Sequence, residues 1–163
     1  MTEQLQVSLW VNGEKVSLKV SPFTSLAQLL RENLGLTGTK VSCNEGECGS
    51  CTIIMDEQVV NSCLVLAPQA DGAEVWTIEG LTPKDGLHPM QEAFLKEGAV
   101  QCGYCTPGFI LSAVALLREN PEPSDEEIIE SIAGNLCRCT GYHKIVTAIR
   151  SCAEAIREAE MSV

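Results

Sequence analysis

The sequence predicts an α+β protein in which a small sheet domain comes first and a helical domain follows. Near the N-terminus apolar residues alternate with polar ones, as in half-buried strands, whereas after residue 86 they recur at helical spacing. Between the two patterns lies the polar segment 82–86, which contains proline and glycine. We therefore expect two domains, residues 1–80 and residues 81–163.

Two hairpins and one further strand are expected in the first domain. Apolar residues alternate at 5–11 and 16–20, and an Asn-Gly pair between these stretches favours a type I′ turn. A second hairpin is expected at 52–55 and 59–61, and a further strand at 75–78. These strands should form a small sheet.

A short helix and a long loop separate the two hairpins. Ser25 and Gln28 have the spacing of a capping box, and the leucine-rich helix that begins there ends at a glycine. Residues 36–51 show no hydrophobic periodicity, so we expect a bound group to fix the shape of this loop. Gly46 and Gly49 would let the backbone approach that group closely.

Four helices are expected in the second domain. Pro89 opens the first and Pro107 the second, because proline is compatible with the first turn of a helix. Ser124 and Glu127 form a capping box for the third, and the fourth covers residues from about 144 to 160. Short turns connect them, which predicts a small four-helix bundle.

Nine cysteines dominate the chemistry of the chain, and no export signal precedes them, so metal ligands are expected in preference to disulfides. The first set has the spacing C-x4-C-x2-C-x11-C and consists of Cys43, Cys48, Cys51 and Cys63. Its first three members match the plant-type spacing of a 2Fe-2S cluster, in which soft thiolates bind iron. The competing interpretation is a four-cysteine zinc site, although such sites usually contain two C-x2-C pairs.

The second set contains Cys102 and Cys105, then 31 intervening residues, then Cys137 and Cys139. Both pairs lie at predicted helix starts or junctions, so folding can bring them together, and helix N-termini favour a negatively charged group. On spacing alone, a zinc ion held between helices competes with an iron-sulfur cluster at this site.

The ninth cysteine and the histidines are not expected to bind metal. Cys152 lies on the last helix at a position that suits a small buried hydrophobic residue. His143 is close in sequence to the second cysteine set, but four thiolates already complete that set, so we expect a surface or packing role.

Composition argues against several classes of partner and activity. The 11 basic and 22 acidic residues give a net charge of −11, which opposes binding to nucleic acid or to an anionic membrane surface. No apolar run reaches the roughly 20 residues of a membrane span, so we expect no membrane insertion and a cytoplasmic protein. No Ser-His-Asp set, phosphate loop or dinucleotide motif appears, so no catalytic residue is assigned.

The segments GECGSCT, QCGYCTPGF and GNLCRCTGY together resemble the iron-sulfur subunit of the molybdenum hydroxylase family, which includes xanthine dehydrogenase, aldehyde oxidoreductase, nicotinate dehydrogenase and aerobic carbon monoxide dehydrogenase. The resemblance extends from about residue 5 to residue 153. It implies a β-grasp ferredoxin-like domain and a four-helix domain, each with one 2Fe-2S cluster.

The resemblance also implies an electron relay. Gln101 and Cys139 would contact the molybdopterin cofactor, which a large partner subunit holds. Electrons would pass from there through the C-terminal cluster to the N-terminal cluster, and then to an FAD-binding medium subunit or another acceptor. Substrate conversion would take place on the partner chains.

Two positions depart from the family pattern, since Ser42 stands where many relatives have glycine and Ser50 where alanine is frequent. A serine hydroxyl near cluster sulfur could raise the reduction potential, but a tolerated small residue is the favoured interpretation. Two alternative functions remain open: a free-standing two-cluster ferredoxin, and a zinc-binding interaction module.

Overall fold

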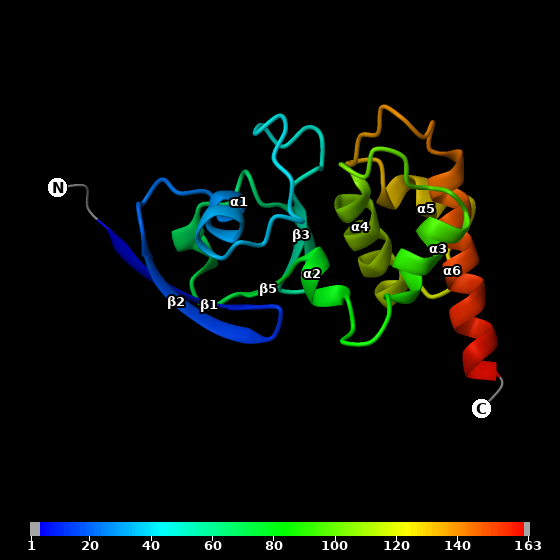
Figure 1. Cartoon of the computed structure of the whole chain (residues 1–163), viewed down its shortest axis with the longest axis horizontal. Coiled ribbons are helices and arrows are strands. Elements are labelled where there is room, and N and C mark those ends of the chain that lie inside the picture. The colour runs from blue at the N-terminus through cyan, green and yellow to red at the C-terminus, as the bar shows by residue number, and fades with distance from the viewer. Residues whose placement is uncertain (1–3, 162–163) are drawn as a thin grey trace.

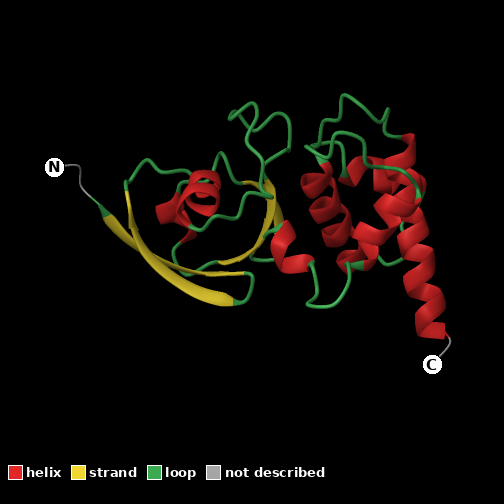
Figure 2. Cartoon of the chain, in the orientation of Figure 1, coloured by secondary structure: helices red, strands yellow, loops and turns green. Residues whose placement is uncertain are grey.

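The structure is a computed structural model that describes residues 4–161, and it has two parts that lie side by side along its longest axis (Figure 1). Strands are confined to the N-terminal part and helices form the C-terminal part, so the predicted α+β class is confirmed (Figure 2). The strands are β1 (Leu5–Val11), β2 (Glu14–Val20), β3 (Thr52–Met55), β4 (Gln58–Asn61) and β5 (Glu74–Trp76). The helical segments are α1 (Leu26–Gln28), a π-helical turn (Leu29–Asn33), a 3-10 turn (Ala67–Ala70), α2 (Ile78–Leu81), α3 (Pro89–Lys96), α4 (Thr106–Glu119), α5 (Asp125–Ser131) and α6 (His143–Met161).

Within the described part of the chain, five strands form one mixed sheet in the order β2-β1-β5-β3-β4. The first predicted hairpin is confirmed: β1 and β2 pair antiparallel, and Asn12 and Gly13 between them have the positive φ angles (52° and 82°) of a type I′ turn. The second hairpin, β3 with β4, is confirmed as well. β5 joins the two hairpins, because it pairs parallel with β1 and antiparallel with β3.

The predicted capping box begins the first helix. The Ser25 hydroxyl accepts a hydrogen bond from the Gln28 backbone N–H (3.2 Å), and the Gln28 side chain accepts one from the Ser25 N–H (3.1 Å). The helix continues as a π-helical turn, and its leucines are fully buried in a cluster with side chains of the sheet. This cluster is the apolar core of the N-terminal part.

The predicted strand at 75–78 is wrong in its second half. β5 ends at Trp76, and α2 begins at Ile78. Thr77, which is fully buried, donates its backbone N–H to the Asn12 side chain (2.8 Å), and its hydroxyl accepts a hydrogen bond from the same side chain (3.0 Å). These bonds turn the chain out of the sheet, and Ile78 packs against the helical part.

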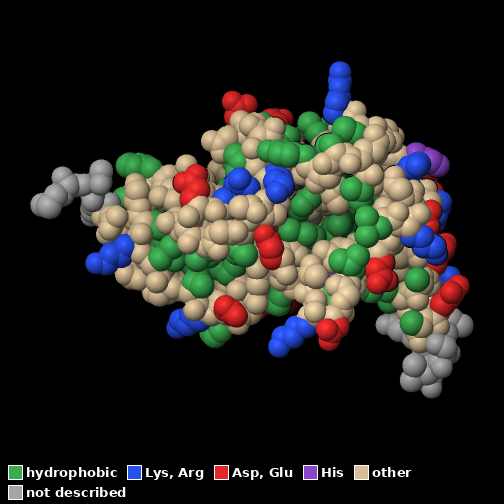
Figure 3. Space-filling view, in the orientation of Figure 1, with side chains coloured by type: hydrophobic (Ala, Val, Ile, Leu, Met, Phe, Trp, Pro, Cys, Tyr) green, Lys and Arg blue, Asp and Glu red, His purple; other side chains and the backbone are tan. Residues whose placement is uncertain are grey.

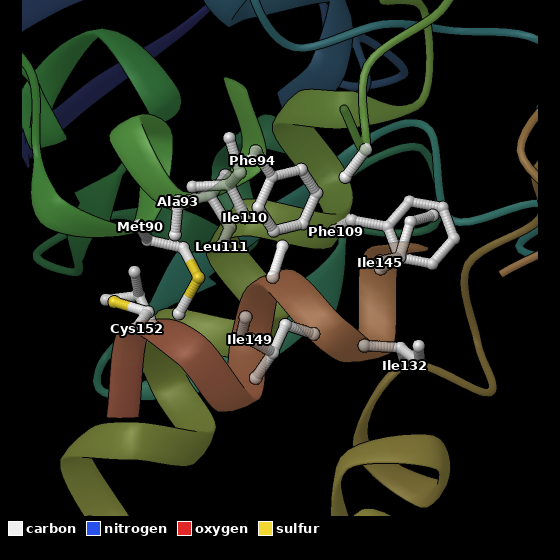
Figure 4. Close-up of a cluster of buried hydrophobic side chains, with 14 of the residues drawn as sticks. Met90, Ala93, Phe94, Phe109, Ile110, Leu111, Ile132, Ile145, Ile149 and Cys152 are labelled. Carbon is white, nitrogen blue, oxygen red and sulfur yellow. The ribbon is translucent and has the colours of Figure 1, made fainter. Parts of the chain in front are cut away.

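The four predicted helices of the second part are confirmed as α3, α4, α5 and α6. Pro89 is the first residue of α3, Pro107 lies in the first turn of α4, and Ser124 caps α5. The helices enclose an apolar core, shown in Figure 4, whose largest fully buried side chains include Met90, Phe94, Phe109, Leu111, Ile128 and Ile145. Within residues 4–161, no helix is both long and apolar enough to span a membrane.

The sheet and the helices meet where β3 packs against α4. Ile54 of β3 belongs to the same buried cluster as the helical side chains. Gly108 on α4 approaches the Gly49 carbonyl so closely that a Cβ atom at position 108 would lie 2.5 Å from that oxygen. The two parts are therefore in direct backbone contact.

Asn135 completes this contact with a buried polar network. Its side chain, only 3% exposed, donates to the Gly49 carbonyl (2.9 Å) and to the Thr52 hydroxyl (3.0 Å). It also accepts a hydrogen bond from the Ser112 hydroxyl on α4 (2.8 Å). One side chain thus ties together the cysteine loop, β3 and α4.

Replacing Asn135 with alanine should destabilise the chain by about 2–4 kcal/mol, because the Ser112 hydroxyl would lose its buried acceptor, and the Gly49 carbonyl would keep only its bonds from Thr52. Urea unfolding followed by circular dichroism measures the change. Asn120→Ala is the matched control, since Asn120 makes only exposed hydrogen bonds, and it should change stability by no more than about 0.5 kcal/mol. Equal losses in the two variants would contradict a special role for the buried network.

His88 makes the stability of the helical part depend on pH. Burial lowers the pKa of His88 below its ordinary value, and the charge of Arg118 lowers it further. The neutral imidazole caps α3, because its Nδ1 accepts a hydrogen bond from the Met90 N–H (3.2 Å). Between the pKa values of the unfolded and folded states, the unfolded chain binds more protons at His88 than the folded chain does. The stability that neutral His88 contributes is therefore present above about pH 6.5, and it is lost as the pH falls through the folded-state pKa.

The variant His88→Asn should lose less stability than the wild type when the pH is lowered from about 7 to about 5, because asparagine keeps a capping acceptor without titrating. Urea unfolding at each pH gives the slope of the unfolding free energy against pH for the wild type and for the variant. The idea would be abandoned if the slopes of the two proteins coincided.

Candidate metal centres

Two glycines shape the loop that carries the first three cysteines. Gly46 and Gly49 have positive φ angles (80° and 65°). A side chain at Gly46 would collide with Leu64, and one at Gly49 would collide with the Gly134 carbonyl. The expected reason for these glycines was close backbone approach to sulfur, and the structure adds tight packing against neighbouring segments as a second reason.

The second hairpin brings the fourth cysteine of the N-terminal set to this loop. Cys51 directly precedes β3, and Cys63 is the second residue after β4. The N–H and the hydroxyl of Ser62 both donate to the Cys51 carbonyl (3.3 and 2.7 Å), which holds the hairpin ends together. The thiols of Cys51 and Cys63 interact directly, and so do those of Cys43 and Cys48.

The C-terminal set forms two pairs as well, although 31 residues separate its halves in the sequence. The Sγ atoms of Cys102 and Cys139 are 3.7 Å apart, and the thiol of Cys105 interacts with that of Cys137. Cys105 is the N-cap residue of α4. The backbone N–H of Cys137 donates to the Tyr142 hydroxyl (3.0 Å), which orients the other half of the set.

The spacing of the paired thiols fits metal binding. Sulfur ligands about 2.3 Å from a tetrahedral metal ion are about 3.8 Å apart, which agrees with the 3.7 Å between the Sγ atoms of Cys102 and Cys139. Two pairs of thiols at each site agree with a 2Fe-2S cluster, in which two cysteine sulfurs bind each iron.

Hydroxyl groups stabilise one thiolate at each site. Burial raises the pKa of Cys48, but hydrogen bonds from the side chain and backbone of Ser50 and of Cys43 outweigh this effect and lower the pKa to about 7. Burial also raises the pKa of Cys137, but hydrogen bonds that the hydroxyl and N–H of Thr140 donate to its sulfur outweigh this effect and lower the pKa. Each site thus has one thiol that loses its proton more readily, and the resulting thiolate is the form that binds metal.

Deeper sulfurs behave in the opposite way. Burial raises the pKa of Cys51 to about 11 and that of Cys105 to about 12, with smaller increases from neighbouring thiols. A metal must displace the protons of these two thiols when it binds.

The C-terminal site has one open edge. Cys102 and Cys139 are exposed, as is Gln101 beside them, whereas Cys105 and Cys137 lie deeper. The loops of both sites lie at the same edge of the molecule, the upper edge in Figure 1. Figure 3 shows hydrophobic side chains, a class that includes cysteine there, reaching the surface along this edge. An external group can therefore reach the Cys102–Cys139 pair.

Hydrogen bonds connect the two cysteine loops directly. The N–H of Leu136 donates to the Cys48 carbonyl (2.9 Å), and the Tyr104 hydroxyl donates to the Val41 carbonyl (2.8 Å). The sequence analysis did not identify these contacts, nor the role of Asn135. The only signal in the sequence was that these residues lie in or beside the cysteine motifs. That position did not predict which residues in the other half of the chain they would bind.

Cys152 lies apart from both sites. It is 2% exposed and packs among the helical side chains (Figure 4), which confirms its predicted packing role. Burial raises the pKa of the Cys152 thiol to about 11. His143 is exposed at the start of α6.

Comparison with known protein families identifies both halves of the chain. Residues 9–77 match the 2Fe-2S iron-sulfur cluster binding domain, and residues 77–150 match a second 2Fe-2S binding domain. The nicotinate dehydrogenase small FeS subunit of Eubacterium barkeri is 50% identical over 151 residues, which cover 93% of this chain and 96% of that protein.

Solved structures show the same similarity. A chain of quinoline 2-oxidoreductase from Pseudomonas putida 86 matches with a TM-score of 0.91 and 46% identity, over 96% of this chain and 98% of the other. Aldehyde oxidoreductase from Desulfovibrio desulfuricans matches with a TM-score of 0.90 and 46% identity, over 94% of this chain but 17% of the other. In the latter protein, the matching region is a small part of a much longer chain.

Replacing Cys105 with alanine should remove about half of the bound iron and acid-labile sulfide, because one of two clusters loses a ligand. Cys152→Ala is the control and should retain the full content, at a cost in stability of about 1 kcal/mol from lost packing. Metal analysis and sulfide assay measure both. Loss of iron from the Cys152 variant, or zinc without sulfide in the wild type, would contradict the assignment.

Proposed function

The chain belongs to the family of small iron-sulfur subunits of the molybdenum hydroxylases, and from this premise we propose that it relays electrons between the molybdenum centre of such an enzyme and a second acceptor. One observation carries the proposal: two four-cysteine sites lie in one chain, and their loops hydrogen-bond to each other. The chain acts as a subunit of an oxidoreductase, and substrate conversion belongs to its partners.

We assign each cluster to one cysteine set. When bound, a 2Fe-2S cluster accepts and donates one electron. The paired thiols, the lowered pKa values of Cys48 and Cys137, and the spacing of the first set support the assignment. The N-terminal ligands are Cys43, Cys48, Cys51 and Cys63, and the C-terminal ligands are Cys102, Cys105, Cys137 and Cys139.

The exposed edge of the C-terminal site gives the relay its direction. Gln101 and Cys139 form the contact with the pterin of the molybdenum cofactor, and their exposure next to the site supports this role. At the N-terminal site Cys51 is buried, and none of the four cysteines is as exposed as Cys102 and Cys139. Electrons enter at the C-terminal site and leave from the N-terminal site.

The partners follow from the length of the relatives. Aldehyde oxidoreductase from Desulfovibrio desulfuricans contains the matching region as 17% of its chain. The name of the Eubacterium barkeri relative identifies it as a small subunit. We therefore place the molybdopterin cofactor of this enzyme on a separate large subunit, and the next acceptor, FAD, on a medium subunit.

The residues between the sites keep them at a fixed separation. Tyr104, Asn135 and Leu136 each bond to the backbone of the N-terminal cysteine loop. A fixed separation suits electron transfer, which needs no motion of the chain. We propose the domain boundary at 80/81, near the end of α2 (Ile78–Leu81) and just ahead of the exposed turn 82–86. Free thiol ligands are consistent with a cytoplasmic location.

The complex itself tests the proposed direction. Purified under gentle conditions, the wild-type chain should co-elute with a larger molybdenum-containing subunit. Cys139→Ser should disturb the molybdenum EPR signal, because it alters the pterin contact. Cys43→Ser, the matched variant at the other site, should leave that signal unchanged while substrate can still reduce molybdenum.

Two results would contradict the proposal. A chain that elutes as a monomer without any partner would favour a free-standing two-cluster carrier. If Cys139→Ser lost its cluster and left the molybdenum signal intact, the proposed pterin contact would be incorrect.

A further inference from the structure

Ser50 places a hydroxyl group against a sulfur atom of the N-terminal site. Its Oγ lies 3.2 Å from the Sγ of Cys48, and the side chain is buried, with 4% of its surface exposed. The only other acceptor that its hydroxyl reaches within residues 4–161 is the Lys40 carbonyl, at the longer distance of 3.4 Å. The backbone of Ser50 is held separately, because its carbonyl accepts the Lys40 N–H (3.1 Å).

The direction of this hydrogen bond follows from the chemistry of a metal ligand. A cysteine that binds iron is a thiolate, so its sulfur can only accept, and the hydroxyl of Ser50 must donate. Hydrogen bonds to charged acceptors are stronger than neutral ones, and burial protects this one from competition by water.

We propose that Ser50, acting through Cys48, raises the reduction potential of the N-terminal cluster. Reduction adds one electron and therefore negative charge, which strengthens a hydrogen bond donated to a ligand sulfur and favours the reduced state. The electron comes from the C-terminal cluster, and Ser50 keeps its proton throughout. The contact favours this role over the simpler interpretation of Ser50 as a tolerated small residue, and the inference rests on the proposed relay function.

Ser62 provides an internal control. It is a buried serine in the same site, but its hydroxyl donates to the Cys51 carbonyl (2.7 Å) and not to a sulfur atom. Removal of the Ser62 hydroxyl therefore changes packing and hydrogen bonding near the site without removing a bond to sulfur.

The test is an EPR-monitored redox titration of the purified complex. Ser50→Ala should shift the midpoint potential of one cluster to more negative values and leave the other unchanged. The equilibrium constant for electron transfer to the N-terminal cluster should fall by up to about tenfold, which corresponds to about 59 mV for one electron. Ser62→Ala should show a much smaller shift, and Ser50→Thr, which retains a hydroxyl, should restore the potential.

The possible outcomes separate this inference from the proposed function. Two clusters with an unchanged midpoint in Ser50→Ala would overturn the role of Ser50 alone, and so would an equal shift in Ser62→Ala. A protein that contains zinc in place of iron and sulfide would overturn the relay function, and the inference with it.

Discussion

The carbonyl groups of Cys48 and Gly49 accept hydrogen bonds from Leu136 and Asn135, and the arrangement of both metal sites depends on this contact. The donors precede Cys137 and the acceptors belong to the first cysteine loop. The bonds therefore connect ligand-bearing segments directly, with no intervening element that could flex. The Asn135–Gly49 bond is buried, so its polar atoms have no access to water as an alternative partner.

Burial differs between the two pairs of sulfurs in the C-terminal site, and this difference makes the site asymmetric. The C-terminal site exposes one pair of sulfurs and buries the other more deeply, so that its two sides face different surroundings. A carrier that served many partners in turn would gain little from such an arrangement. A subunit of a fixed complex would use both sides of this site. The exposed pair of sulfurs would face a cofactor of the partner, and the deeper pair would face the second site of the same chain.

Local signals in the sequence were sufficient for most of the secondary structure. The Asn12-Gly13 turn and the Ser25–Gln28 capping box depend on neighbouring residues alone, and both formed as predicted. The strand expected at 75–78 failed because a distant side chain, that of Asn12, binds Thr77 and redirects the chain. Elements that depend on contacts across the fold cannot be read from a local pattern.

The same distinction applies to the sites. Spacing alone favoured a 2Fe-2S site at the first cysteine set, because a single loop and hairpin hold it, whereas the same prediction for the second set required resemblance to known proteins. Asn135 carried no recognisable signal, since its partners Gly49 and Thr52 lie more than eighty residues away in the sequence. Only the folded chain shows that these residues belong to one network.

The close approach of Gly49, Gly108 and Gly134 has a consequence for protein engineering. A side chain on either Gly49 or Gly108 would occupy space that already holds backbone of the other part of the chain. The halves therefore do not behave as interchangeable modules. A chimera that combined this ferredoxin-like half with a foreign helical half would need compatible glycines on both surfaces before its clusters could be aligned.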